Sequence, residues 1–189
     1  EGTANHAGTT PMSMRRDAGL AAARVTTFLR DRVTAGNAGS VATIGSLRLE
    51  PNVINVIPSR AIFTVDLRDP DEERLRTLEA DLAAFLDELA AKEDVRISVE
   101  RLARFEPVIF DETLVRTIEA AAEALGLPSR RMTSGAGHDA QMIARIAPAA
   151  MIFVPSRAGI SHNPREHTDP ADLVAGANVL LRVVTGLAM

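Results

Sequence analysis

The chain has 189 residues, of which 46% are hydrophobic, and its formal net charge is -4. This length and composition allow one ordinary domain or two small ones with packed cores. An acidic chain without Tyr or Trp gives no reason to expect a nucleic-acid partner. Because cysteine is absent, disulfides, catalytic thiols and thiolate zinc sites are excluded, and any metal must be held by His, Asp or Glu.

The sequence shows no targeting signal. No run approaches about 18 uninterrupted apolar residues, and the opening EGTANHAGTT lacks the basic start and apolar core of a signal peptide. We therefore expect a cytoplasmic protein without a membrane partner. Since the chain starts without Met, inside what looks like a turn motif, we also expect it to be a fragment of a longer protein.

The first half of the chain alternates helical and strand patterns. Residues 15–33 carry apolar side chains near helical spacing, which predicts a helix. Alternation and β-branched residues predict a strand over 40–50 and a further strand pair over 52–69. Residues 69–93 place leucines at three- and four-residue steps behind an acidic first turn, which is typical of a helix. Strict alternation returns at 95–102.

If the opening GTANHAG is also a strand, the order becomes β-α-β-β-α-β, the split arrangement of ferredoxin-like α+β domains. Residues 1–104 are therefore predicted to form one compact domain. The remainder, residues 105–189, is predicted to contain helices near 111–125 and 141–147, a fully buried strand in AMIFVP, and a final helix from about Pro170. This second part resembles a piece of an α/β sheet with too few strands to be the whole sheet.

The segment TSGAGHDA is the first candidate site. Two glycines before a helix let backbone N–H groups approach an anion or a developing oxyanion, with His138 and Asp139 at the rim. The alternative is a tight turn in which Asp139 only caps the helix.

The loop GISHNPREHT follows the predicted buried strand, where open α/β sheets usually place their ligand sites. Its residues His162, Glu166 and His167 have a spacing that superficially resembles helical metalloprotease motifs. Pro164 and Pro170 disfavour the unbroken helix that those motifs need. The alternative is that these histidines only face solvent.

Two further groups lie in the first half of the chain. In NHAGTTPM, His6 follows a predicted strand and precedes a stiff turn. Asn55 and Arg68 lie on neighbouring predicted strands, where an arginine can bind a carboxylate through two parallel hydrogen bonds. The alternatives are an ion pair between Arg68 and Asp66, Asp69 or Asp71, and a turn or edge role for Asn55.

A serine hydrolase is a weaker hypothesis. It would use Ser161 or Ser134 as nucleophile with His138 or His162 as base. The nucleophile-elbow pattern G-x-S-x-G is missing, because Ser161 is followed by His162 and Asn163.

Together, the motifs NHAGTTPM, NVIPSRAIFTVDLR, SGAGHDAQ and FVPSRAGISHNPREHT resemble the zinc-dependent amidohydrolases of the aminoacylase superfamily. The nearest branch contains N-carbamoyl-L-amino acid hydrolase, allantoate amidohydrolase and bacterial β-ureidopropionase. The resemblance covers essentially the whole chain. It implies a ferredoxin-like lid and dimerisation domain at 1–104, followed at 105–189 by the C-terminal part of an α/β zinc-exopeptidase-like catalytic domain.

The resemblance also implies roles for single residues. His162 corresponds to a zinc ligand, and His6, Asn55 and Arg68 correspond to lid residues that bind the substrate in the partner subunit of a homodimer. Gly137 corresponds to a backbone contact to the substrate, and His138 lies beside it; His6 and His138 are the candidate catalytic side chains. The implied reaction is hydrolysis of the ureido or amide C–N bond of an N-carbamoyl-L-amino acid or a related ureido acid, by water activated at one or two zinc, manganese or cobalt ions.

The chain departs from this family pattern in one respect. Family members carry a His-x-Asp pair, a Glu-Glu pair and a further His upstream of the lid, and these motifs are missing here. A catalytic zinc usually takes three protein ligands, so we expect the 189-residue chain alone to be inactive. The remaining alternatives are an allantoate amidohydrolase, and a noncatalytic dimerising or ligand-binding module.

Overall fold

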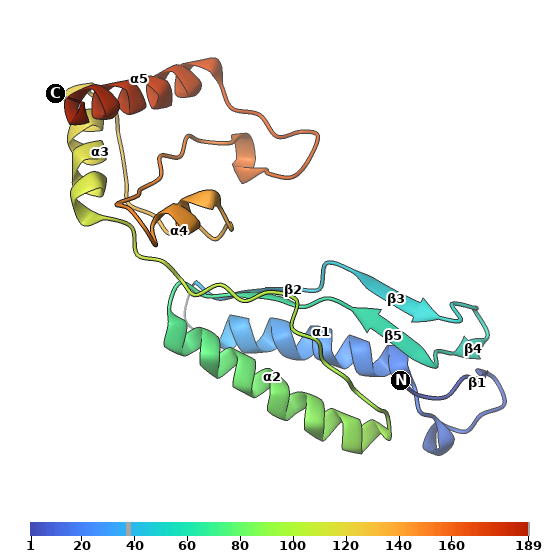
Figure 1. The fold of residues 1–189 in the computed structure, drawn as a ribbon. Helices are drawn as coiled ribbons and strands as arrows, with labels where there is room; N and C mark the ends of the chain where they lie inside the picture. Colours follow the sequence, from blue (N-terminus) through green and yellow to red (C-terminus); the bar gives the residue numbers. More distant parts are fainter. Residues whose placement is uncertain (37–38, 189) are drawn as a thin grey trace. The chain divides into compact units, whose positions relative to one another are not determined.

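The computed structural model describes residues 1–36 and 39–188. The chain is mixed α/β and divides into two compact units, Glu1–Pro107 and Val108–Met189. Figure 1 shows the elements of each unit, coloured in chain order.

In unit 1 the described strands form three antiparallel pairs in place of one continuous sheet. They are β1 (Asn5–His6) with β4 (Val56–Ile57), β2 (Val41–Thr43) with β6 (Asp66–Arg68), and β3 (Leu47–Glu50) with β5 (Arg60–Phe63). The strand predicted over 40–50 is thus split into β2 and β3. The prediction of a strand over 95–102 is wrong for the described chain. Only one reciprocal backbone pair forms there, between Glu1 and Arg96 at 2.7 and 2.8 Å.

Both helices predicted for unit 1 are confirmed as α1 (Ala18–Ala35) and α2 (Glu72–Glu93). Aspartates cap their first turns, because Asp17 accepts hydrogen bonds from the N–H groups of Gly19 and Leu20, and Asp71 accepts one from Arg74. A short 3₁₀ turn at Met12–Met14 precedes α1.

The core of unit 1 lies between these helices and the strands. The rings of Phe28 on α1 and Phe85 on α2 stack with centroids 4.0 Å apart, next to the buried Val25. Phe63 and Leu67 pack against the same cluster from the strands, which fixes the inward face of β5 and β6. Figure 1 shows the two helices side by side along the strands.

Asp69 joins the end of β6 to the start of α2. Its side chain is 0% exposed and accepts hydrogen bonds from the Ser40 hydroxyl at 2.5 Å, the Asp71 N–H at 2.7 Å and the Arg74 guanidinium at 2.9 Å. Burial disfavours its charged form, but these donors outweigh that effect and lower the pKa of Asp69. Asp69 therefore contributes stability as a carboxylate.

The described residues of unit 2 form three α-helices. They are α3 (Glu112–Ala124), α4 (Asp139–Ile143) and α5 (Pro170–Leu187), and a 3₁₀ turn at Arg157–Gly159 lies between the last two. The small core consists of Ala121 and Ala122 of α3 packed against Val179 and Val183 of α5.

The prediction of a buried strand in AMIFVP is wrong for the described chain. Residues 149–155 are assigned no strand, and the side chain of Phe153 is 48% exposed. A strand needs neighbouring strands to satisfy its N–H and C=O groups, and unit 2 supplies none among the residues that the structure describes. The segment still packs closely on α5, since a Cβ atom at Gly176 would lie 2.5 Å from Val154 Cγ1.

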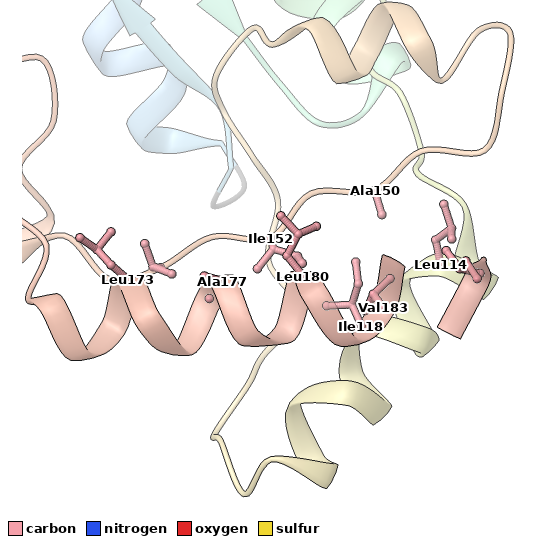
Figure 2. A pocket seen from close by; sticks show the side chains of 11 residues that line it. Leu114, Ile118, Ala150, Ile152, Leu173, Ala177, Leu180 and Val183 are labelled. Carbon is pink, nitrogen blue, oxygen red and sulfur yellow. The ribbon is translucent and has the colours of Figure 1, made fainter. Parts of the chain in front are cut away.

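An open apolar hollow with a volume of about 400 Å³ lies along α5. Figure 2 shows Leu173, Ala177 and Leu180 of α5 lining it together with Ile152. Helix α5 is also long and apolar enough to cross a membrane, with a mean hydropathy of 1.3. The core helix of a globular protein passes the same test, so the length and hydropathy of α5 do not by themselves indicate a membrane span.

Candidate functional site

His6 and Asn55, two of the predicted lid residues, lie on neighbouring parts of the backbone. Antiparallel pairing places His6 opposite Val56, and the Ala7 N–H donates to the Asn55 carbonyl at 2.8 Å. Both side chains are exposed. The pairing of two short strands therefore brings together residues that lie 49 positions apart in the sequence.

The turn after His6 is fixed by hydrogen bonds. The buried Thr10 donates its hydroxyl hydrogen to the His6 carbonyl at 2.7 Å, and Arg15 donates to the carbonyls of Ala7 and Thr10 at 2.6 and 3.1 Å. The Gly8 N–H donates to Nδ1 of His6 at 3.0 Å. A backbone N–H can only donate, so the neutral ring carries its hydrogen on Nε2 and presents a donor to solvent.

Arg68 lies on β6, opposite Val41 of β2. Its guanidinium forms a two-pronged pair with Asp66, with Nε to Oδ1 at 2.8 Å and Nη2 to Oδ2 at 2.6 Å. These hydrogen bonds lower the pKa of Asp66 and raise the pKa of Arg68. The ion-pair alternative for Arg68 is thus formed in this structure. Both side chains are about half exposed, so the pair is accessible to a competing carboxylate.

In the TSGAGHDA segment, His138 and not Asp139 is the N-cap of α4. Nδ1 of His138 accepts the Ala140 N–H at 3.0 Å, while Asp139 is the first helical residue. The expectation of an Asp139 cap is wrong, because the imidazole takes the position that a capping oxygen normally occupies. The neutral His138 ring again carries its hydrogen on Nε2.

Gly137 lies in open space beside this cap. A Cβ atom there would meet only Oε1 of Gln141, at 4.0 Å, and the residue does not have a positive φ. Neither the backbone conformation nor the packing of the described residues requires glycine at this position.

His162 lies at the tip of the loop between the 3₁₀ turn and α5, with an exposed side chain. Its φ of +54° is in the left-handed region, which costs a residue with a Cβ atom roughly 1–2 kcal/mol. The His162 N–H donates to Oε2 of Glu166 at 3.0 Å. Non-glycine residues held in this region cluster at functional sites.

The base of the same loop is closed by other contacts. The Arg157 N–H donates to the His167 carbonyl at 2.8 Å, and the Arg157 guanidinium donates to Asp169 at 2.7 Å. Nε2 of His167 lies 3.2 Å from the same Asp169 oxygen. His167 is thereby tied to the loop base, which separates its role from that of His162.

Among the described residues, no group of three or more His, Asp or Glu side chains could hold a metal ion. The imidazole of His162 is exposed and makes no hydrogen bond within the described part of the chain, so a ring nitrogen is available for coordination. His162 alone supplies fewer ligands than a catalytic zinc, which usually takes three from the protein.

One strong cluster was missed at the sequence level. The Arg131 guanidinium makes paired hydrogen bonds to Glu119 at 2.7 and 2.8 Å and to Glu112 at 2.9 and 3.0 Å. They lower the pKa of both glutamates and raise the pKa of Arg131. The cluster fixes the start of the SGAGHD segment to α3. Because Arg131 follows the end of the helix by several residues, no helical spacing predicts these pairs.

Comparison with known proteins places the chain. Residues 5–186 match peptidase family M20/M25/M40. An N-carbamoyl-L-amino-acid amidohydrolase from Rhizobium meliloti is 40% identical over 179 residues, which are 95% of this chain and 43% of that protein. An allantoate amidohydrolase from Bacillus subtilis (strain 168) is 39% identical over 188 residues, which are 100% of this chain and 46% of that protein.

A solved structure agrees with these relatives. The chain superposes on a hydantoinase/carbamoylase family amidase from Burkholderia multivorans with a TM-score of 0.90 and 42% identity, covering 96% of this chain and 44% of that one. The mixed α/β fold of the chain is therefore shared with part of an amidase of known structure. The chain belongs to peptidase family M20/M25/M40, whose members generally use divalent metal ions. It spans less than half the length of these relatives.

Proposed function

We propose that these residues form part of a metal-dependent amidohydrolase that cleaves the C–N bond of N-carbamoyl-L-amino acids. The observation that carries the proposal is similarity at about 40% identity, over nearly the whole chain, to amidohydrolases with that name. Allantoate, another ureido acid, is the alternative substrate, because relatives of equal similarity carry that name.

The assignment of domains belongs to this proposal. Residues 1–104 act as a ferredoxin-like lid, and residues 105–189 form the C-terminal part of the catalytic domain. Support for the lid comes from backbone bonds that join the start of the chain to two other predicted strand segments: Glu1 pairs with Arg96, and the Gly2 N–H donates to the Ser59 carbonyl at 2.7 Å. Both bonds agree with the strand neighbours that a split β-α-β-β-α-β arrangement requires.

His6 is proposed to bind the substrate as a hydrogen-bond donor. The Gly8 N–H occupies Nδ1, so the group that His6 offers is the Nε2–H. A donor aimed at a carbonyl oxygen stabilises the negative charge that develops there during attack by water. His138 offers the same donor group, because the Ala140 N–H occupies its Nδ1.

The carboxylate of the substrate is assigned to Arg68, with help from Asn55 and the Gly137 backbone. A planar guanidinium binds a carboxylate through two parallel hydrogen bonds, as Arg68 already does with Asp66. In this scheme the substrate competes with Asp66. The open surroundings of Gly137 leave room for a ligand to approach its backbone N–H.

His162 is proposed to hold a divalent ion, zinc or else manganese or cobalt, with one or two ions per site. Such an ion lowers the pKa of bound water and polarises a carbonyl oxygen. A catalytic zinc usually takes three protein ligands, so the remaining ligands and the general base would be supplied by the part of the relatives' length that this chain does not span. The 189 residues alone are accordingly expected to be inactive.

The proposed assembly is a cytoplasmic homodimer formed through the lid, in which His6, Asn55 and Arg68 reach the partner subunit's active site. Exposed apolar side chains on unit 1 support such an interface, among them Val41, Leu47 and Ile54, the last 104% exposed.

The test uses a full-length protein that contains these residues. Ammonia and amino-acid release are measured from N-carbamoyl-L-amino acids, from allantoate and from an unmodified dipeptide, before and after treatment with a chelator. We expect turnover of a ureido acid that the chelator abolishes and added zinc, manganese or cobalt restores. Turnover that survives complete metal removal contradicts the metal mechanism, and inactivity of the metal-loaded protein on the whole panel favours a noncatalytic binding module.

A further inference from the structure

The loop that carries His162 also contains Glu166, whose carboxylate contacts the residues at the start of the loop. One carboxylate, that of Glu166, accepts the His162 N–H on Oε2 at 3.0 Å and the Ser161 hydroxyl on Oε1 at 3.4 Å. Both bonds have the Glu166 carboxylate as acceptor, and the bond to His162 is the stronger of the two because it is shorter. Glu166 therefore binds the backbone of the residue whose φ is +54°.

The carboxylate is itself held by a tight turn. The Glu166 N–H donates to the Asn163 carbonyl at 2.9 Å, and the Arg165 N–H donates to Oδ1 of Asn163 at 2.9 Å. Between them, Pro164 has a φ restricted by its ring. The four residues after His162 thus return the chain so that the Glu166 side chain lies against the His162 N–H.

We propose that Glu166 is a positioning residue that holds His162 in its left-handed conformation and so sets the direction of its imidazole. A residue with a Cβ atom adopts this conformation only when its surroundings favour it, and the Glu166 hydrogen bond is the contact that favours it here. The ring of His162 makes no hydrogen bond within the described part of the chain, so the backbone fixes the direction of its Cα–Cβ bond and thereby the region that the imidazole can reach. This inference rests on the proposed role of His162 as a metal ligand.

The test compares Glu166→Ala and Glu166→Gln with the control Glu123→Ala, an exposed glutamate of α3 in the same unit, all in the full-length protein. Two quantities are measured: amide hydrogen exchange at His162 in the metal-free protein, and the zinc dissociation constant by competition with a chromophoric chelator. Glu166→Ala should speed exchange at His162 and weaken zinc binding about 10- to 100-fold. Glu166→Gln keeps an acceptor oxygen and should stay within about threefold of the wild type, and Glu123→Ala should match the wild type.

If Glu166→Ala unfolds, Glu166→Asp gives the same test, because it keeps the charge but withdraws the carboxylate by one methylene and should also weaken zinc binding. Wild-type zinc affinity in Glu166→Ala overturns the positioning role. Equal losses in the Ala and Gln variants also overturn it, since they would show that charge matters and the hydrogen bond does not. A parallel His162→Ala variant separates the two proposals: if it binds zinc like the wild type, the proposed function has failed, whatever Glu166 does.

Discussion

Arg68 is the residue at which two interpretations predict opposite results. If its guanidinium binds the substrate carboxylate, Arg68→Ala leaves that carboxylate desolvated and without its ion-pair partner. KM should then rise by an amount that corresponds to about 2 to 5 kcal/mol of binding free energy. Steady-state kinetics on the full-length enzyme measures this change. An unaltered KM would make Arg68 a structural residue.

Asp66→Asn is the matched control for Arg68. Asp66 accepts two hydrogen bonds from the Arg68 guanidinium, so the variant removes a charge that competes with the substrate carboxylate. If the substrate is the functional partner of Arg68, KM should stay the same or fall. A rise in KM as large as that of Arg68→Ala would instead indicate that the ion pair itself is what the site needs.

Gly137 is predicted to matter for binding and not for folding. Gly137→Ala should change the thermal midpoint little, since the added Cβ meets only Gln141 Oε1 at 4.0 Å and surface substitutions usually stay within about 0.5 kcal/mol. It should raise KM, because the methyl group obstructs the approach of the ligand to the backbone. Gly45→Ala is the control, as its Cβ would meet nothing within 4 Å. A wild-type KM for Gly137→Ala would remove Gly137 from the site.

For single residues, the sequence predicts the candidates for the site but not the contacts that their side chains make. Four motifs led to His6, Asn55, Arg68 and His162, while their partners are set by loop geometry that has no period. The cap made by the His138 ring, the left-handed φ of His162 and its bond to Glu166 all depend on local backbone angles. Their roles in substrate and metal binding remain predictions.

Among the elements, the junction at Asp69 gives a prediction about pH. The pKa of Asp69 is lowered in the folded chain, so its contribution to stability is complete above the pKa of the unfolded chain, about 3.9, and is lost as the pH falls through the lower folded value. Asp69→Asn removes this contribution and should destabilise unit 1 by roughly 1–3 kcal/mol near neutral pH. Urea midpoints at pH 7 and between pH 4 and 2 measure the difference between the two proteins. That difference should shrink below about pH 4, and a constant difference would show that the charge of Asp69 is not responsible.

Helices were the elements that the sequence predicted well, and strands were not. A helix satisfies its backbone within one segment, so the leucine spacing and aspartate caps of α2 suffice to predict it. A strand depends on neighbours. Residues 95–102 and 149–155 have strand composition but lack the partners that would complete a ladder within the described chain.

On the scale of the whole molecule, unit 2 exposes much of its apolar surface. Leu180, Leu181 and Val184 on α5 are all more than half exposed. Leu180 also lines the hollow shown in Figure 2. Apolar patches of this kind normally contact another part of a protein. Under the proposed function, the rest of the catalytic domain covers this face and also supplies the ligands and base that the described residues lack.

The central claim is that His162 coordinates a divalent ion in the full-length enzyme, and anomalous diffraction from zinc-loaded crystals tests it most directly. We predict an anomalous peak about 2.0–2.1 Å from one imidazole nitrogen of His162, with the other ligands contributed by residues outside this chain. Zinc bound elsewhere, with the His162 ring directed away from it, would contradict the account.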